Sequence, residues 1–391
     1  MKRRDLIRYS LLGAGSLAVS TNGRQMRAIA SVDPPIYDWI LLYWMPYDND
    51  LSRFGRDILQ MLENSVQSDN ILVVVEADFS HTRTLSRYVI THEGMTRYIL
   101  DTSDSSSDET LANYLNWARS AFTSRHWVVT FLGHGGILDE LSPDDKPDLR
   151  ANSSRTWMKL DRIQEHLTAF NAAIDDRLEL LFFQNCNKSA IEVLYTVKDV
   201  APYTLASQML LGAPNYYYEG ALPFLAANPN IDGVELAAKI IESEARSMYH
   251  SYSAIDNRSL DEFPDKLDPL IASILEGRLD AIDLDTVVTY NYSGDRFVDL
   301  VEFFQTLAAQ TEADPRLTRK FVEFCQEKIV REFDTEGELW TSNTRSSYQH
   351  FSGLGLFLPE TPADLDRYRS LPIYTDTALP DLFAAIFNSE L

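Results

Sequence analysis

The sequence contains only two cysteines in 391 residues, Cys186 and Cys325. Small exported domains that lack a large core rely on several disulfides, and two cysteines are too few for such a framework. A chain of this length can bury a sizeable hydrophobic core, which must therefore supply the stability. Cys325 lies in an expected helix, residues 321–325, among apolar neighbours, and we interpret it as a buried packing residue.

Basic residues are also scarce, because 35 Lys and Arg stand against 58 Asp and Glu, for a formal net charge of -23. Phosphate binding depends on clustered Lys and Arg, and no such cluster follows the first residues of the chain. We therefore expect no nucleic-acid partner. The acidic stretch 139–148 gives a weak indication of divalent-cation binding, although such stretches are more often solvated loops.

The chain has no apolar run long enough to span a bilayer. The run at residues 11–19 is too short, and it follows the pair Arg3 and Arg4, so residues 1–30 resemble a twin-arginine signal peptide. We expect cleavage after Ala30, with Ser20 as the alternative site and a retained signal anchor as a third possibility.

The signal implies export by the twin-arginine machinery to the periplasm or the exterior. We expect no stable membrane anchor after cleavage.

Two common hydrolase signatures are missing. The sequence has no Gly-x-Ser-x-Gly elbow, which a serine hydrolase on a doubly wound sheet requires. Its seven histidines include no His-Glu-x-x-His pair, the usual zinc-peptidase motif. Both classes are therefore disfavoured.

Apolar segments without polar alternation recur between amphipathic helical segments. This pattern predicts an α/β fold with a mostly parallel sheet covered by helices on both faces. The expected strands are 38–44, 70–76, 126–132, 178–183 and 203–207, and the expected helices are 50–63, 109–120, 161–172, 192–198 and 234–249.

The second half of the chain has a different pattern. Residues 259–333 are expected to be mainly helical, and residues 351–359 have the composition of a strand that returns to the main sheet. We expect a signal peptide at 1–30, an α/β core at 31–235 and a helical C-terminal region at 236–391 that completes the domain.

Two expected strands run directly into reactive residues. The strand 126–132 is followed by Gly133-His134-Gly135-Gly136, and the strand 178–183 by Gln184-Asn185-Cys186. Reactive groups in open parallel sheets gather just past the carboxyl ends of strands. The glycines let a substrate backbone approach the imidazole, and we expect the start of a helix after Cys186 and a nearby imidazolium to favour the thiolate.

These segments resemble the clostripain-like cysteine peptidases, relatives of caspases, gingipains and legumain. The matching residues are Tyr43–Leu51, Gly133–Gly136 and Asn185-Cys186, with weaker matches at Ala206–Gln208 and Ser352–Leu354. The resemblance covers most of the chain after the signal, in the same order. It implies a caspase-like fold.

The resemblance also implies a catalytic dyad. In it, Cys186 attacks the scissile carbonyl, His134 gives a proton to the leaving amine, and the N–H groups of Gly135 and Cys186 hold the oxyanion. Acyl transfer through a thioester needs no cofactor, and the partners are protein or peptide substrates. Family members are often stimulated by calcium, which is the one cofactor that the resemblance suggests.

The sequence departs from the family at one important position. Members that cleave after Arg or Lys carry Asp two residues before the catalytic cysteine, and Gln184 stands there. A neutral amide cannot balance a buried cation, so Arg or Lys specificity is doubtful. Gln184, Ser207 and Gln208 are the expected pocket residues, and no acid precedes Glu219 in the segment after residue 211.

Two further interpretations stay open at this stage. Family members often mature by cutting a loop between the dyad residues, and Lys146 and Arg150 are candidate self-cleavage positions, with a plain surface loop as the alternative. The altered Gln184 also leaves an inactive exported binding protein with the same fold as the rival function. The presence of both His134 and Cys186 favours the peptidase.

Overall fold

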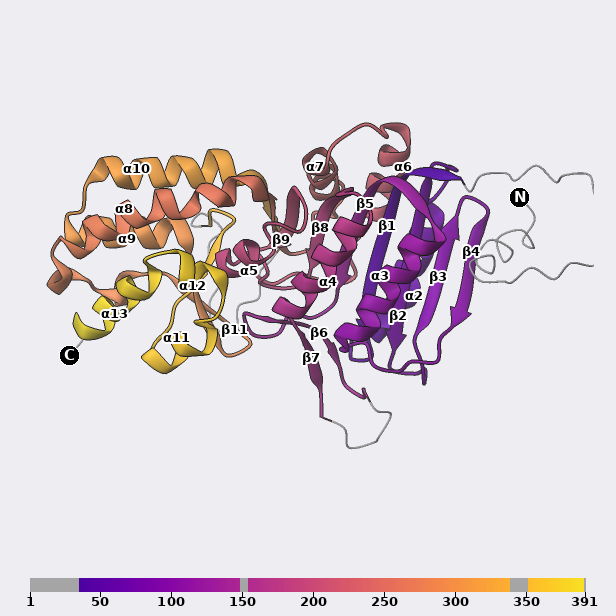
Figure 1. Ribbon diagram of the computed structural model, residues 1–391, viewed down its shortest axis with the longest axis horizontal. Coiled ribbons are helices and arrows are strands. Elements are labelled where there is room, and N and C mark those ends of the chain that lie inside the picture. Colours follow the sequence, from indigo (N-terminus) through magenta and orange to yellow (C-terminus); the bar gives the residue numbers. More distant parts are fainter. Residues whose placement is uncertain (1–34, 148–153, 338–350, 390–391) are drawn as a thin grey trace, which may run out of the picture.

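A nine-stranded sheet forms the centre of the computed structural model, which describes residues 35–147, 154–337 and 351–389 (Figure 1). The strand order is β13-β10-β9-β8-β5-β1-β2-β3-β4. The strands are β1 (Ile36–Tyr47), β2 (Ile71–Phe79), β3 (Ser86–Thr91), β4 (Gly94–Ile99), β5 (Thr123–Leu132), β8 (Leu178–Gln184), β9 (Tyr203–Ser207), β10 (His250–Asp256) and β13 (Val330–Glu336).

The five central strands are parallel, and an antiparallel pair extends the sheet at each edge. β9, β8, β5, β1 and β2 pair in parallel, whereas β3 and β4 continue antiparallel from β2. β10 and β13 are antiparallel beyond β9. The expected mostly parallel α/β sheet is therefore confirmed.

Six helices cover the two faces of the sheet. Successive side chains of β1 point to opposite faces, so Ile40, Leu42 and Trp44 join one core and Leu41 and Tyr43 the other. One face packs against α3 (Asp108–Ala121), α4 (Leu160–Ala173) and α5 (Ile191–Thr196), and the other against α2 (Ser52–Ser65), α6 (Tyr218–Ala227) and α7 (Gly233–Ser243). Burial on both faces explains why the central residues of these strands are mostly apolar.

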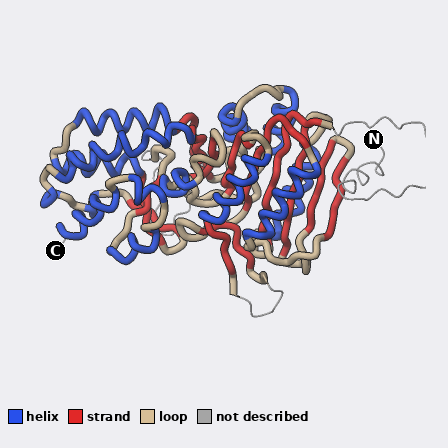
Figure 2. The backbone as a smooth tube through the Cα atoms, viewed as in Figure 1, coloured by secondary structure: helices blue, strands red, loops and turns tan. Residues whose placement is uncertain are grey.

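The C-terminal helices gather beyond the β9 side of the sheet, at the left in Figure 2. They are α8 (Phe263–Leu275), α9 (Leu300–Thr311), α10 (Pro315–Phe324), α11 (Pro362–Tyr368), α12 (Pro372–Asp376) and α13 (Leu379–Ser389), with short helical turns η1 (Asn257–Glu262), η2 (Leu279–Ala281), η3 (Leu284–Thr286) and η4 (Cys325–Ile329). Cys325 is fully buried beside Phe321 and Ile329, as expected.

Two small sheets complete the fold. β11 (Thr289–Tyr292), β12 (Asp295–Asp299) and β14 (Gly355–Phe357) form one, and β6 (Glu140–Asp144) and β7 (Thr156–Lys159) form the other.

Several sequence expectations need correction. β14 lies in the small sheet rather than in the main one, and the strand that returns to the main sheet is β13 instead. The expected helix 234–249 ends at Ser243, because the chain must turn back to enter β10. β3 and β4 were also missed, and β4 is the exposed edge strand, where polar residues hide the strand pattern.

No helix among the described residues is both long and apolar enough to cross a membrane. The expected signal peptide, residues 1–30, lies outside the described residues.

Candidate active site

The register of the sheet brings His134 and Cys186 to neighbouring positions. β5 and β8 are adjacent and parallel with Leu132 opposite Gln184, and the two residues lie two positions beyond this pair. Neighbouring strands are about 4.8 Å apart. The Asn185 side chain joins the two loops, because its Nδ2 donates to Gly133 O at 2.8 Å and to His134 O at 3.3 Å. Both reactive residues line one open pocket of about 330 Å³.

Two glycines in the histidine loop are required by the backbone. Gly133 has φ of 111°, in the region that side chains rarely adopt. A Cβ on Gly135 would lie 2.4 Å from Cys186 O, so only glycine allows the two loops to approach this closely. The glycines therefore set the distance between the histidine loop and the cysteine loop.

His134 is held by a carboxylate that follows β1. Its Nε2 lies 2.8 Å from Asp50 Oδ1, and the Asp50 side chain is 63% exposed. An ionised carboxylate only accepts hydrogen bonds, so Nε2 carries the proton and Nδ1 is left for other partners. Partial burial alone would raise the pKa of Asp50, but the hydrogen bond and charge of His134 outweigh this effect and the pKa is lowered.

Cys186 lies in a turn rather than at a helix N-terminus, which corrects one sequence expectation. The next helix, α5, begins at Ile191 and has six residues, so its dipole does not favour the thiolate. Burial raises the pKa of the Cys186 thiol, and hydrogen bonding with Leu211 and Tyr292 and the charge of Lys188 oppose this rise. The Leu211 N–H donates to Sγ at 3.3 Å. Within the described residues, the groups that favour the thiolate are therefore Lys188 and these hydrogen-bond partners.

Lys188 and Tyr292 both donate hydrogen bonds to the backbone of the histidine loop. The buried Lys188 Nζ donates to Ile137 O at 3.0 Å and to Leu138 O at 3.1 Å. Burial lowers the pKa of Lys188 to about 8, although nearby acids oppose the shift. The Tyr292 hydroxyl donates to Gly135 O at 2.6 Å. These bonds fix the loop that follows His134.

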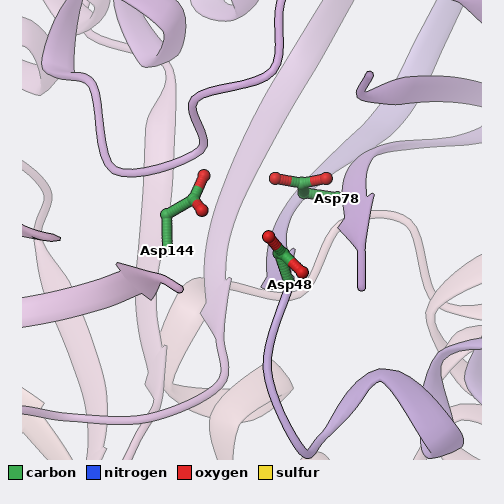
Figure 3. A group of neighbouring side chains, drawn as sticks. All are labelled: Asp48, Asp78 and Asp144. Atoms are coloured by element: carbon green, nitrogen blue, oxygen red, sulfur yellow. The ribbon is translucent and has the colours of Figure 1, made fainter. Parts of the chain in front are cut away.

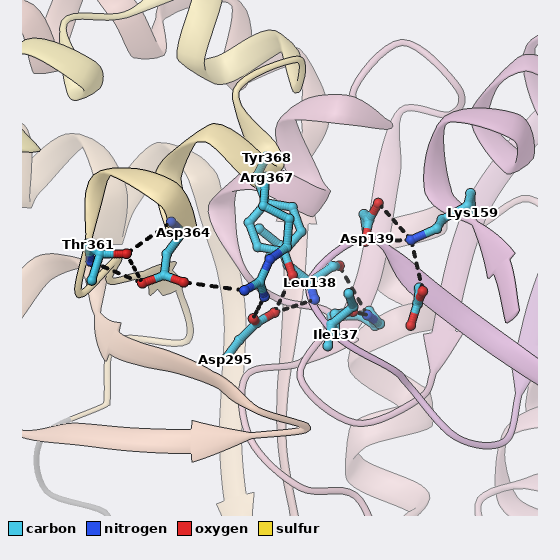
Figure 4. Close-up of polar contacts among 11 residues, drawn as sticks. Ile137, Leu138, Asp139, Lys159, Asp295, Thr361, Asp364, Arg367 and Tyr368 are labelled. Atoms are coloured by element: carbon cyan, nitrogen blue, oxygen red, sulfur yellow. Dashed lines mark hydrogen bonds and ion pairs between the residues drawn. The ribbon is translucent and has the colours of Figure 1, made fainter.

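The C-terminal helices reach the same loop through Asp295, as Figure 4 shows. Asp295 Oδ2 accepts from Leu138 N at 2.8 Å and from the Tyr368 hydroxyl at 2.6 Å, and Arg367 pairs with Oδ1 at 3.0 Å. Asp295 is 2% exposed, so these hydrogen bonds compensate for the burial of its charge. The C-terminal region thus contributes to the shape of the site.

Two backbone N–H groups remain available beside Cys186. Gly136 N donates to Glu140 O and Ser142 N donates to His134 O, so the intervening Gly135 N–H points away from β6. Within residues 35–147, 154–337 and 351–389, the N–H groups of Gly135 and Cys186 donate to no other residue.

Gln184 lines the pocket, but its amide is fully engaged. Its Nε2 donates to Asn215 Oδ1 at 2.6 Å and to the Tyr218 hydroxyl at 3.1 Å, while the Tyr217 hydroxyl donates to Oε1 at 3.0 Å. Asn215 Nδ2 in turn donates to the buried Glu244 at 3.0 Å. Among the described residues that line the pocket, Asp50 is the only acid, and Arg53 adds a positive charge.

The other expected pocket residues lie elsewhere. Ser207 and Gln208 are fully buried, and neither lines the pocket. The Ser207 hydroxyl pairs with that of Ser251, and Gln208 Nε2 donates to Asp299 and to Leu354 O. Both residues hold β9 against its neighbours, because they end a strand whose two faces are covered.

Of the two candidate self-cleavage positions, only Lys146 lies among the described residues. The Lys146 side chain is 48% exposed and lies 3.5 Å from Asp48 Oδ1. Arg150 lies outside the described residues.

Three buried aspartates form a group that fits a metal ion (Figure 3). Asp48, Asp78 and Asp144 each offer one carboxylate oxygen, and these oxygens lie within 4.8 Å of one another. Burial, together with the charges of Asp144 and Asp48, raises the pKa of Asp78 to about 8. Such hard oxygen donors fit the calcium that the sequence resemblance suggested.

Sequence reasoning missed four residues around His134 and Cys186: Asp50, Lys188, Leu211 and Tyr292. Asp50 lies in the Asp-Asn-Asp-Leu segment that carried the resemblance. Lys188 lies only two residues after Cys186, so its place in the sequence could have indicated that it contacts the site. Nothing local marks Leu211 or Tyr292, because only the tertiary fold brings them to Cys186.

Comparison with known proteins agrees with this architecture. An inactive zymogen of a C11 protease from Parabacteroides distasonis has a TM-score of 0.68 and 18% identity, over 88% of this chain and 99% of that one. A secreted C11 cysteine protease from Bacteroides thetaiotaomicron, bound to an irreversible peptide inhibitor, has a TM-score of 0.67 and 18% identity over the same shares. Among curated proteins, none matches the sequence. The model of the clostripain family matches residues 43–379, so the chain belongs to the clostripain family of cysteine peptidases.

Proposed function

We propose that the chain is an exported endopeptidase that cleaves peptide bonds with Cys186 as nucleophile and His134 as its proton-transfer partner. The observation that carries the proposal is the position of both residues on one open pocket, at the ends of adjacent parallel strands. The same geometry counts against an inactive binding protein, which would have no need for a histidine oriented by Asp50 beside a partly exposed cysteine.

The reaction follows from the bonds that these groups can make. His134 takes the thiol proton of Cys186 as the sulfur bonds to the scissile carbonyl carbon, and the carbonyl oxygen takes up negative charge facing the N–H groups of Gly135 and Cys186. The C–N bond breaks as His134 gives its proton to the leaving amine. Water then attacks the thioester carbon while His134 accepts a proton from it. The C–S bond breaks, the acid product is released, and the Cys186 sulfur takes the proton back from His134.

The pocket favours a neutral substrate side chain over Arg or Lys. The amide of Gln184 is occupied by Asn215, Tyr217 and Tyr218, and the one acid in the described lining is already bonded to His134. A buried ammonium or guanidinium would therefore lack a counter-charge, at a cost of several kcal/mol.

Export is proposed from the N-terminal sequence. The Arg3-Arg4 pair and the short apolar run support passage through the twin-arginine machinery. The B. thetaiotaomicron relative, described as secreted, is consistent with this location.

The test measures cleavage of a peptide library while iodoacetamide modifies the cysteines of the protein. It asks whether the loss of cleavage follows the modification of Cys186. We expect iodoacetamide to alkylate the partly exposed Cys186 at least 10-fold faster than the buried Cys325, and cleavage to disappear in proportion. Peptide mapping identifies the modified residue. The matched control is Cys325→Ala, which should keep both cleavage and its loss on alkylation. Cleavage that survives full alkylation of Cys186, or no cleavage of any peptide by the reduced protein, would contradict the proposal.

Asp50 acts through His134, so its removal should slow the reaction without unfolding the protein. We expect Asp50→Asn to lower kcat about 10-fold with little change in KM, because the imidazole loses the partner that fixes its tautomer and orientation. The pair is largely exposed, so thermal stability should change little.

The control for Asp50→Asn is Asp57→Asn on the exposed face of α2, which should leave kcat unchanged. Asp50→Glu should restore part of the rate. An unchanged kcat in Asp50→Asn would rule out the positioning role.

A further inference from the structure

The most buried part of the active-site pocket is a wall of three polar residues. Tyr47, Gln184 and Asn215 line the pocket and are 1%, 4% and 1% exposed. Tyr47 ends β1, Gln184 ends β8, and Asn215 lies between β9 and α6. Gln184 comes two residues before Cys186, so this wall lies beside the substrate residue that precedes the cut.

A buried carboxylate behind the wall sets the orientation of its two amides. Glu244 Oε1 accepts from the N–H groups of Tyr216 at 2.8 Å and Ala245 at 2.9 Å, and its Oε2 accepts from Asn215 Nδ2 at 3.0 Å. Burial raises the pKa of Glu244, and these three donors oppose the rise by favouring the carboxylate, which can only accept hydrogen bonds. Asn215 therefore turns Oδ1 toward Gln184, and Gln184 presents Nε2 to it.

Both N–H groups of each amide are used within this network. Gln184 Nε2 donates to Asn215 Oδ1 and to the Tyr218 hydroxyl, and Asn215 Nδ2 donates to the carboxylate and to the Tyr252 hydroxyl at 3.0 Å. Among the described residues, Gln184 Oε1 accepts one hydrogen bond, from Tyr217, and Asn215 Oδ1 accepts one, from Gln184. An amide oxygen has two lone pairs. The two amides can therefore accept further hydrogen bonds but can donate none.

Tyr47 supplies the hydroxyl of this wall, and no described residue forms a hydrogen bond with it. Burial raises the pKa of Tyr47, and no hydrogen bond opposes the shift. Burial also raises the pKa of Tyr218 and of Tyr252, and the nearby Tyr47 adds to both shifts, so the three hydroxyls lie close together. A buried hydroxyl without a partner is unfavourable. A ligand group that accepts from Tyr47 would remove this penalty.

We propose that Tyr47, Gln184 and Asn215 form a subsite for a side-chain carboxamide, so that the chain cuts after glutamine or asparagine. This assignment rests on the proposed peptidase function and names its substrate class. The oxygen of a carboxamide would accept from the Tyr47 hydroxyl, and its two N–H groups would donate to the free lone pairs of the two amide oxygens. Every polar group of the wall and of the substrate side chain then has a partner.

Other side chains leave part of this wall unpaired. Arg and Lys have only donors, and they bring a charge that no free acid of the described lining balances. A carboxylate has only acceptors, so it would face the lone pairs of both amides with Glu244 behind them. An apolar side chain leaves the Tyr47 hydroxyl without a partner. A site built to form hydrogen bonds rejects analogues that lack the matching group.

The test compares short peptides that differ only in their last residue, which is Gln, Asn, Met, Glu or Lys and is followed by a fluorogenic amine. Met has the length of Gln without the amide, Glu has its shape with a charge, and Lys has only donors. Binding is measured on the full chain carrying Cys186→Ala, and cleavage is measured on the parent. We expect the better of the Gln and Asn peptides to bind and to be cleaved roughly 10- to 100-fold better than the other three.

Tyr47→Phe removes the hydroxyl and keeps the ring. We expect it to reduce the preference for the carboxamide peptide over the Met peptide about 10-fold, with binding of the Met peptide unchanged. Its Tm should equal or exceed that of the parent, because the lost hydroxyl has no partner in the described chain. A purely structural role would instead weaken both peptides and lower the Tm. The matched control is Tyr98→Phe in the exposed strand β4, which should keep the parent preference.

Three results would overturn the subsite. They are the absence of any preference for the Gln or Asn peptide in binding to Cys186→Ala, tighter binding of the Glu or Lys peptide, and a Tyr47→Phe variant that keeps the full preference. A carboxamide preference in binding together with no cleavage by the parent would support the subsite and contradict the proposed peptidase function. Binding to Cys186→Ala thus distinguishes the failure of one from the failure of the other.

Discussion

We expect His134→Ala to lower kcat/KM about 10³-fold on any peptide that the parent cleaves. Proton transfer by a positioned side chain contributes about 10²–10⁴-fold to such reactions. We expect the middle of this range rather than its lower end, because burial raises the pKa of Cys186 and no helix dipole compensates for it. Without the imidazolium, the thiolate becomes rare and the leaving amine loses its acid.

Two measurements check this prediction. Steady-state cleavage gives the loss of activity, and the rate of alkylation of Cys186 at pH 7 should fall as well, since alkylation also requires the thiolate. The control is His92→Ala in the exposed turn between β3 and β4, which should leave both rates unchanged. A His134→Ala variant that keeps a tenth of the parent activity would show that another group does this work.

We expect Gln184→Glu to shift cleavage toward Arg and Lys by roughly 10- to 100-fold in relative kcat/KM. A hydrogen bond to a charged group is worth about 1.5–3 kcal/mol, which corresponds to this range. Gln184 lies on the pocket wall and contacts Asn215, behind which Glu244 is buried. A carboxylate at this position would be unfavourable until a cationic substrate side chain enters and pairs with it.

The measurement is a library varied at the residue before the cut, compared between the parent and the variant. Glu219→Gln is the matched control, because Glu219 is exposed on α6 and does not line the pocket, so the preference should stay that of the parent. Efficient cleavage after Arg or Lys by the parent itself would contradict our interpretation of Gln184. An unchanged preference in Gln184→Glu would show that another part of the site selects the substrate.

The core strands were predictable because both of their faces are buried. Segments such as 71–75 and 180–183 carry apolar residues at every position, which is typical of a parallel strand covered on both faces. The outer strands were less visible. β4 is exposed over much of its length, and β10 closely follows a helix. Neither segment therefore shows a pattern of apolar residues that distinguishes it from the residues around it.

The candidate site was predictable to the extent that it is local. His134 and Cys186 each follow a recognisable strand, and Gln184 was identified by its spacing from Cys186. Ser207 and Gln208 were misplaced, since their position past a strand end suggested the pocket, whereas the packing of β10 and residues 353–354 encloses them.

By itself, the sequence determined the five central parallel strands and the helices between them, the residue types at the ends of β5 and β8 and the absence of an acid at position 184, because these depend on neighbours along the chain. The tertiary structure decided which distant groups surround them. Tyr292 and Leu211 reach Cys186, and Asp48, Asp78 and Asp144 meet, only because the parallel register and the C-terminal packing place separate segments at one edge of the sheet.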